Sequence, residues 1–247
     1  MRKLLITLGL LMANDAYADT CIPKPDCADM GYTETSCDGG ALKCPFDTTK
    51  LFCTSSLPPA VECDVGMIYY SNGKCYSEYS TSYGIALGVV VVGDSLVMGA
   101  PISMSWATDY ENIIDLPDIG YSSGPVGDIN GKGNTLAIVS QHVGSGQTIS
   151  TSAAMYCNNH APTGTSAGQW YLPAAGELYS YVYGNYTKLK PTVQAMGWTY
   201  FDYNCLWSSS EYKDMDAWYM CVEEGDIKNT GKNSSMQVSC FLDISGS

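Results

Sequence analysis

The sequence predicts an α+β domain that follows a small disulfide-rich module. Three observations support this prediction. The chain has 247 residues and 45% of them are hydrophobic, which is enough to bury a substantial core. Its 11 cysteines are crowded near the N-terminus and widely spaced afterwards. The strand and helix patterns that follow do not repeat as βαβ units, so we expect an α+β arrangement.

Residues 1–18 have the pattern of a secretory signal peptide. A basic start is followed by an apolar run at residues 4–13, which is too short for a permanent membrane span, and small residues precede a cleavage site before Asp19. A lipoprotein anchored through Cys21 is the alternative, although the preceding residues make a poor lipobox. We therefore expect a secreted, periplasmic or bacterial cell-surface protein with no transmembrane segment in its mature chain.

The overall charge restricts the class of ligand. The chain has 12 Lys and Arg against 25 Asp and Glu, with a sequence pI near 4.3, which argues against a nucleic-acid binder. Loss of the signal peptide would leave 10 lysines, 24 acidic residues, a charge of −14 and no arginine. The usual bidentate clamp for phosphate or carboxylate would then be missing. A neutral glycan or a protein is the expected partner.

The cysteines divide the chain into two parts. Residues 19–60 are rich in Pro, Gly, Asp and Thr, so we predict a cysteine-rich module held by disulfides and a linker that contains Pro58 and Pro59. The α+β domain then spans residues 61–247. The group near the N-terminus has an odd count and consists of Cys21, Cys27, Cys37, Cys44, Cys53, Cys63 and Cys75.

The first elements of the domain are predicted from turn residues and apolar runs. Residues 66–70 read as a strand, followed by a turn at Asn72 and Gly73. Residues 85–92 are strongly apolar and β-branched, which fits a buried strand. Residues 105–135 are rich in Gly, Asp and Ser, and we expect them to be mostly loop.

Helices and further strands are predicted in the second half. Residues 151–159 predict a short helix capped by Ser150 or Thr151. A second helix is expected over residues 177–186, opened by Pro173 and small residues. Three later segments alternate as strands, at residues 198–207, 217–223 and 236–243.

Motifs for catalysis and metal binding occur only in incomplete form. Residues 120–124 and 164–168 match G-x-S-x-G, but neither lies between a predicted strand and helix, as a nucleophile elbow must. Cys157 and His160 look like half a zinc site without a second pair. Residues 128–139 imitate an EF-hand loop that lacks its final bidentate Glu. We expect no catalytic residues, no metal and no cofactor.

The final third of the chain is rich in aromatic residues. Tryptophans are more often core than surface residues, and we place four of them there: Trp170, Trp198, Trp207 and Trp218. Tyrosines with neighbouring Asn and Asp suit recognition loops, because each ring offers a large contact area at low entropic cost. The candidate ligand-binding residues are Tyr200, Asp202, Tyr203, Asn204, Tyr212, Asp214, Asp216 and Asn229.

Five short motifs in order resemble one family. Residues 170–178 resemble the W-x-L-P-x-x-x-E-L signature of the DUF1566 family, the C-terminal domain type of Legionella collagen-like protein. The resemblance covers about residues 64–244. The other matching segments are residues 130–135 (D-G-K-x-N-T), 153–157 (A-A-x-x-C), 206–212 (W-S-S-T-E-Y), and 217–219 with 225–232 (A-W-Y and G-x-x-x-x-x-x-K).

The resemblance implies a C-type-lectin-like fold. By analogy Cys157 would pair with Cys240 and Cys205 with Cys221, which makes a domain with two disulfides. Closing the longer interval should stabilise the domain by about 4 kcal/mol on the chain-entropy model. The calcium-dependent sugar motifs of such lectins are absent, since residues 116–118 read L-P-D where E-P-N or Q-P-D is needed.

These observations favour a secreted or surface-exposed binding or adhesion protein that recognises its ligand without calcium. A sharper version of this hypothesis is a diversified receptor, because Asn, Tyr, Ser and Asp, the residues favoured by adenine-directed diversification, are common in residues 200–235. The alternative is a modifying enzyme or oxidase of the formylglycine-generating kind, which needs a reactive thiol in the C-terminal domain.

Overall fold

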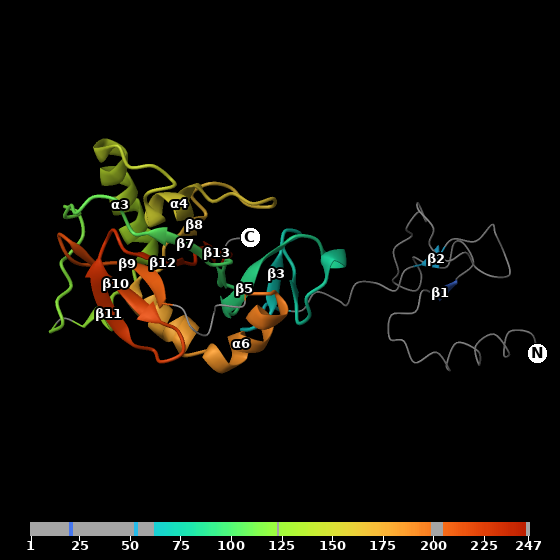
Figure 1. Ribbon diagram of the computed structural model, residues 1–247. Coiled ribbons are helices and arrows are strands. Elements are labelled where there is room, and N and C mark those ends of the chain that lie inside the picture. The colour runs from blue at the N-terminus through green and yellow to red at the C-terminus, as the bar shows by residue number, and fades with distance from the viewer. Residues whose placement is uncertain (1–19, 22–51, 54–61, 123, 199–204, 246–247) are drawn as a thin grey trace, which may run out of the picture. The chain divides into compact units, whose positions relative to one another are not determined.

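Figure 1 shows the computed structural model of the protein. The residues that it describes are 20–21, 52–53, 62–122, 124–198 and 205–245. The chain divides into two compact units, Met1–Pro59 and Ala60–Ser247, and each is described by itself. In the first unit, β1 (Thr20–Cys21) pairs antiparallel with β2 (Phe52–Cys53). The disulfides predicted for this module lie outside the described residues.

The second unit is α+β and contains two sheets. The larger sheet has the order β4-β3-β5-β6-β13-β8, and all its neighbouring strands are antiparallel. Its strands are β3 (Ile68–Tyr70), β4 (Cys75–Tyr76), β5 (Ala86–Val92), β6 (Leu96–Met98), β8 (Trp170–Tyr171) and β13 (Phe241–Asp243).

The first two predicted strands are confirmed, and their residues explain why they form. β3 and β4 are joined across the predicted turn, where Gly73 has a φ of 77° and Asn72 Oδ1 accepts a hydrogen bond from Lys74 N at 3.0 Å. β5 is apolar along its whole length because both of its faces are covered. Leu87 and Val90 belong to one buried cluster, whereas Val89 and Val91 belong to another.

The smaller sheet has the order β11-β10-β9-β12-β7. Its strands are antiparallel except for β12, which lies parallel to β9 at the pair Gln237 and Leu206. The bounds of these strands are β7 (Ile102–Ser105), β9 (Cys205–Lys213), β10 (Asp216–Cys221), β11 (Ile227–Gly231) and β12 (Ser235–Val238).

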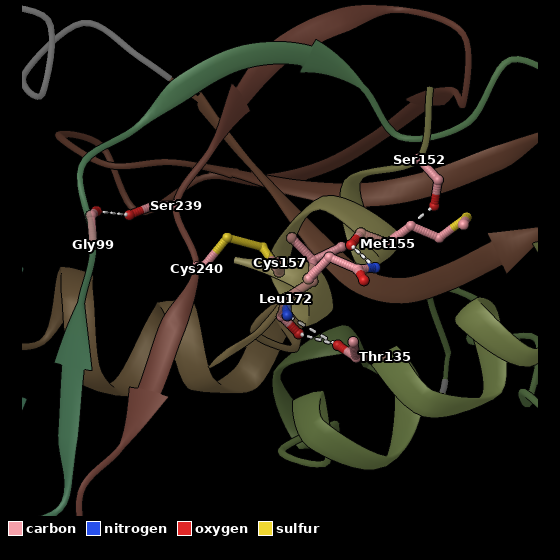
Figure 2. Close-up of a disulfide and its surroundings, with 9 residues drawn as sticks. Gly99, Thr135, Ser152, Met155, Cys157, Leu172, Ser239 and Cys240 are labelled. Atoms are coloured by element: carbon pink, nitrogen blue, oxygen red, sulfur yellow. Dashed lines mark hydrogen bonds between the residues drawn. A yellow bond between two sulfur atoms is a disulfide. The ribbon is translucent and has the colours of Figure 1, made fainter. Parts of the chain in front are cut away.

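Two chain segments connect the sheets, one from β6 to β7 and the other from β12 to β13. They are held together where they cross, because Gly99 N donates to Cys240 O at 2.8 Å and Ser239 Oγ donates to Gly99 O at 2.6 Å (Figure 2). The single strand predicted over residues 236–243 is therefore wrong. Its two halves pair with different sheets, so the ladder is interrupted at Ser239 and Cys240.

The helix predicted over residues 151–159 is confirmed as α4 (Ala153–Asn159). Its cap is Ser152 rather than Ser150 or Thr151, because the Ser152 hydroxyl accepts a hydrogen bond from Met155 N at 3.2 Å (Figure 2). In Figure 2, Cys157 of this helix reaches the crossing between the sheets and bonds to Cys240. This disulfide ties α4 to both sheets at once.

The loop predicted over residues 105–135 is wrong at its C-terminal end. The helix α3 (Gly131–Ser145) begins inside it and covers most of the segment that imitates an EF-hand loop. Glycine and asparagine have low helix propensity, so this first turn did not look helical. Tertiary packing requires glycine there, because a Cβ on Gly131 would lie 2.7 Å from Ala174 N and would also overlap the Glu177 carboxylate.

The second predicted helix, over residues 177–186, is broader and less regular than expected. α5 (Ala175–Glu177) continues as a π-helical segment, η3 (Leu178–Tyr183), and is followed by α6 (Tyr186–Ala195). We did not predict α6, which contains Pro191 within a mostly polar sequence. The two short 3-10 helices are η1 (Thr81–Tyr83) and η2 (Pro125–Gly127).

The remaining strand predictions are correct in kind but displaced in position. The strand expected over residues 198–207 begins at Cys205 and extends to Lys213 as β9. The strand expected over residues 217–223 is β10. The short strands β6, β7, β8 and β11 were not predicted, because they have two to five residues and weak alternation.

The described part of the domain contains three disulfides, whereas we expected two. Two of them join Cys157 with Cys240 and Cys205 with Cys221, the same pairs that the family resemblance implies. The third joins Cys63 and Cys75, which we had grouped with the N-terminal cysteines. It ties the start of the domain to the edge strand β4. The N-terminal module therefore retains five cysteines, and the odd thiol of the chain is one of these.

Candidate ligand-binding site

Several of the residues that carry the family resemblance lie in the interior. Trp170 is buried, and its Nε1 donates to Thr165 Oγ1 at 3.1 Å. Leu172 and Thr135 exchange two hydrogen bonds, one from Leu172 N to the hydroxyl at 2.9 Å and one from the hydroxyl to Leu172 O at 3.2 Å (Figure 2). The W-x-L-P segment therefore anchors α3 to the strand β8.

Glu177, the acidic residue of the same motif, is a buried capping group. Its carboxylate accepts hydrogen bonds from Ala174 N at 2.8 Å, from the Tyr171 hydroxyl at 3.0 Å and from the backbone of Gly131. Burial raises the pKa of Glu177, while these hydrogen bonds lower it. The carboxylate holds the N-terminus of α3 against α5. Its negative charge also interacts favourably with the positive N-terminal end of the α3 dipole.

This contact makes a matched pair of glycine substitutions informative. Gly131→Ala is expected to destabilise the domain by about 1–3 kcal/mol, because the methyl group has no room beside Glu177. Gly144→Ala lies in the same helix with no atom within 4 Å of the new Cβ, so it should stabilise by about 0.5–1 kcal/mol. Urea unfolding of both variants measures the difference. Equal effects of the two substitutions would contradict the packing described for Gly131.

Asp128 connects three elements in the same region. Its Oδ2 accepts hydrogen bonds from Asn134 Nδ2 at 2.8 Å and from Ser210 Oγ at 2.6 Å, and Ser210 Oγ accepts from Ala175 N at 2.9 Å. The carboxylate that we had compared with the first ligand of an EF-hand thus joins α3, β9 and α5. The residues after it form a helix and not a cation-binding loop.

Glu211 and Lys232 form a fully buried ion pair. The Lys232 ammonium group also donates to Glu111 O at 2.5 Å and Asp214 O at 2.9 Å, and it lies 4.8 Å from the centre of the Trp106 ring. All three of its protons therefore have an acceptor. The pair links the end of β9 to the chain after β11 and holds the loop that precedes Ile113, whose N–H donates to the Glu211 carboxylate at 3.1 Å.

An exposed aromatic group lies on the smaller sheet, over the strands β9, β10 and β11. The Tyr121 ring is 68% exposed and meets two other rings edge to face, with centroid distances of 5.4 Å to Tyr212 and 5.1 Å to Trp218. Tyr212 and Trp218 are 5.2 Å apart. The Tyr121 hydroxyl accepts a hydrogen bond from Asn229 Nδ2 at 2.6 Å. We call these four residues the Tyr121 platform.

The loop that carries Tyr121 is fastened to the sheet by its backbone. Ile119 N donates to Glu211 O at 3.0 Å, and Trp218 Nε1 donates to Ile119 O at 2.8 Å. Ile119 and Trp218 also pack together in a small buried cluster. The exposed ring of Tyr121 is thus held in place by the strands beneath it, and ordering it for a ligand would cost little conformational entropy.

The structure brings together two of the predicted ligand residues, Tyr212 and Asn229. Asp216 lies in β10 opposite Lys213 and Gly231, and Asp214 is exposed in the preceding turn. The other candidates, Tyr200, Asp202, Tyr203 and Asn204, lie outside the described residues. Sequence reasoning missed Tyr121 because we treated residues 120–124 only as a chance G-x-S-x-G match. The available signal in the sequence was the position of Tyr121 between the turn-forming residues Gly120 and Ser122.

The placement of the tryptophans is largely as predicted. Trp170, Trp207 and Trp218 are buried, and Trp198 is partly buried against the second core cluster. Trp106 is a further buried tryptophan. Tyr212, the candidate tyrosine that the structure describes, is half-buried. Four other tyrosines of the final third are also half-buried, so their ring faces are partly used in packing: Tyr181, Tyr183, Tyr186 and Tyr219.

The sulfur of Cys157, which a zinc site would need, is in a disulfide with Cys240. No group of three or more His, Cys, Asp or Glu residues suited to a metal ion occurs within the described ranges. His142 is buried with Nδ1 2.7 Å from Ser152 Oγ, and burial lowers its pKa to about 4. Its neutral ring serves as packing for Trp106 and the start of α4.

A hollow region lies around Tyr79, which is 49% exposed. Cavities of about 330 Å³ and 610 Å³ share this side chain. One is lined by residues of α6 such as Pro191, and the other by Ile85 and Trp198. This region is formed by the larger sheet and α6, whereas the Tyr121 platform is formed by the smaller sheet.

The two sheets and the helices define an α+β domain with an exposed aromatic surface, and comparisons with known proteins place its fold. The chain is similar to a fimbrial protein from Bacteroides ovatus, with 14% sequence identity and a TM-score of 0.51. The match covers 73% of this chain and 48% of that protein, so the chain spans about half of its length. No protein-family model and no curated protein matches the sequence. In the described residues, no helix is long and apolar enough to cross a membrane.

Proposed function

We propose that the protein is a secreted or cell-surface binding protein of the adhesion type and that its ligand contacts the Tyr121 platform. The observation that carries this proposal is the Tyr121 ring, which is largely exposed although two aromatic rings and a hydrogen bond hold it. Aromatic residues held in this way are enriched where proteins bind other molecules. They bury a large area on binding, and little conformational entropy is lost because the ring is already ordered.

The exterior location is supported by independent features. The pattern of residues 1–18 predicts secretion, and the three disulfides of the described domain suit an oxidising compartment. The structural likeness to a fimbrial protein fits a surface protein. We also propose the C-type-lectin-like fold and the relation to the DUF1566 family. Their support is that the matching motifs converge on one buried framework around Glu177 and Glu211.

The proposed ligand is a neutral glycan or a protein, bound without calcium. The platform offers ring surface and the Asn229 amide, and its nearest charges are mixed. Lys213 Nζ lies 5.1 Å from the centre of the Tyr212 ring, while Asp214 and Asp216 follow in the chain. No group of three or more His, Cys, Asp or Glu residues suited to a cation occurs in the part of the chain that the structure describes, and we propose recognition by ring contact and amide hydrogen bonding.

Binding of the full-length protein to a panel of glycans and extracellular-matrix proteins tests this proposal. Binding should persist in EDTA, and Tyr121→Ala should weaken it at least about tenfold, because a central aromatic anchor contributes more than 1 kcal/mol. Tyr79→Ala is the matched control, since Tyr79 is also an exposed tyrosine but lies in the loop after β4, beside the larger sheet. A panel without any ligand, loss of binding in EDTA, or equal effects of the two substitutions would overturn the proposal.

The diversified-receptor hypothesis belongs to the same proposal. Tyr212 and Asn229 are residues that adenine-directed changes produce, and both lie on the platform. Their backbones are in strands, so substitutions of these side chains would alter the surface without altering the ladder. Sequencing the 3′ end of the gene in many cells should show adenine-centred changes at these codons. Invariant codons would dismiss the hypothesis.

A further inference from the structure

A second exposed tyrosine lies on the strand that supports the Tyr121 platform. Tyr110 is 46% exposed, and its ring packs against Gly231 at the end of β11. A Cβ atom on Gly231 would lie 3.5 Å from Cε1 of the Tyr110 ring and 3.6 Å from its hydroxyl oxygen. The ring therefore lies on the side of β11 to which a side chain at position 231 would point.

The strand β11 places Tyr110 and Tyr121 on one face of the smaller sheet. Asn229, whose amide donates to the Tyr121 hydroxyl at 2.6 Å, precedes Gly231 by two residues. Side chains two residues apart in a strand point to the same face and are about 7 Å apart. The pairing of β11 with β10, its neighbour in Figure 1, is regular over this stretch. The two tyrosines thus contact successive positions on one face of β11.

The loop that carries Tyr110 is fastened on both sides of this residue. The Asp109 carboxylate accepts a hydrogen bond from Gln147 Nε2 at 3.0 Å, and Glu111 O accepts one from the buried Lys232 ammonium group at 2.5 Å. Tyr110 therefore resembles Tyr121, because its side chain is exposed while the backbone around it is held. Ordering its ring for a ligand would cost little conformational entropy.

Polar side chains accompany the two rings on this face. Asp216 of β10 lies directly opposite Gly231, and opposite residues of an antiparallel pair point to the same face. Its half-buried side chain is therefore beside the position that Tyr110 covers. The Asn229 amide lies one step along the strand, at Tyr121. We call Tyr110, Tyr121, Asn229 and Asp216 the β11 strip.

The β11 strip has the chemistry to bind a neutral oligosaccharide. The faces of a sugar ring consist of C–H groups that pack on aromatic rings, and its rim carries hydroxyl groups that donate to a carboxylate and accept from an amide. An acidic sugar is disfavoured because Asp216 would repel it. A protein partner would be favoured by a continuous apolar centre, whereas the strip places an amide and a carboxylate beside its rings.

We propose that the ligand of the Tyr121 platform is a neutral oligosaccharide that lies along β11 and also contacts Tyr110. This inference rests on the proposed function and adds to it the class of ligand and a second aromatic contact. A single sugar ring covers only one of the two tyrosines, while a longer chain reaches both. Affinity should therefore increase with the length of the sugar chain.

Titration calorimetry of the full-length protein tests this inference. The probes are neutral hexasaccharides of glucose, mannose and xylose, each compared with its monosaccharide. At least one hexasaccharide should bind at least about tenfold more tightly than its monosaccharide, and Tyr110→Ala should weaken its binding about tenfold. Tyr110→Phe retains the ring and should bind within about twofold of the wild type. Tyr79→Ala, which removes a tyrosine of similar exposure beside the larger sheet, should leave the affinity unchanged.

The outcomes distinguish this inference from the proposed function. If Tyr121→Ala weakens hexasaccharide binding and Tyr110→Ala does not, the Tyr121 platform is retained and the extension along β11 is overturned. If no hexasaccharide binds, but a protein ligand does and Tyr121→Ala weakens it, the proposed function is retained and the oligosaccharide is overturned. Hexasaccharide binding that neither substitution weakens would contradict both.

Discussion

Replacing Lys232 with alanine is expected to lower the free energy of unfolding by about 3–5 kcal/mol. The substitution leaves the Glu211 carboxylate buried without its counter-ion, and it leaves the carbonyl groups of Glu111 and Asp214 without a donor. Removing one partner of a buried pair costs more than the pair contributes, because the remaining charge is desolvated. Urea unfolding at neutral pH measures the loss as a lower midpoint.

Two further variants separate the ion pair from a general effect of removing a lysine. Lys228→Ala removes an exposed lysine paired with Asp226 on the same sheet, and its unfolding midpoint should barely change. Lys232→Met combined with Glu211→Gln leaves no unpaired charge and retains an acceptor for Ile113 N. We expect this double variant to be more stable than Lys232→Met alone. Similar midpoints for Lys232→Ala and Lys228→Ala would refute the role assigned to the pair.

The second large effect is expected from the disulfide between Cys157 and Cys240. Replacing both cysteines with alanine should destabilise the domain by about 4 kcal/mol, because the bond closes a long loop with a sequence separation of 83 residues. The same double replacement at Cys205 and Cys221 opens a loop with a separation of only 16 residues, and about 3 kcal/mol is expected.

Thermal and urea unfolding of the two double variants measure this difference. We expect the Cys157 and Cys240 variant to lose more stability also because its bond ties α4 to the crossing at Gly99 (Figure 2). Each variant has both cysteines removed, so neither introduces a new thiol that could exchange with other disulfides. If the variant without the Cys205–Cys221 disulfide were the less stable of the two, the structural role that we assign to the crossing would be wrong.

The elements that could be predicted from the sequence are those whose local pattern agrees with their surroundings. Residues 85–92 form a strand in any buried environment, and Asn72 with Gly73 forms a turn from its own backbone preference. The helix at residues 153–159 has a hydroxyl cap and an apolar face. In each of these cases the short-range pattern was sufficient to predict the element, because tertiary packing favours the same conformation.

The misplaced elements are those in which a distant residue decides the conformation. The first turn of α3 carries Gly131, which local propensity disfavours, yet only glycine leaves room for the Glu177 carboxylate 46 positions later. Residues 236–243 read as one strand, and only the positions of the two sheets divide them. For the site, composition pointed to Tyr212 and Asn229, but not to Tyr121, which joins them from the loop before η2.

The sequence alone determined the α+β class, the acidic composition, and several strands and helices, because these depend on composition and short-range periodicity. The tertiary structure decided which exposed residues form a surface. Tyr121, Tyr212 and Asn229 are spread over 109 positions of the chain. Surfaces of this kind depend on which distant strands pair and on buried ion pairs such as that of Glu211 with Lys232. Local sequence patterns do not predict either of these, because the residues involved are far apart in the chain.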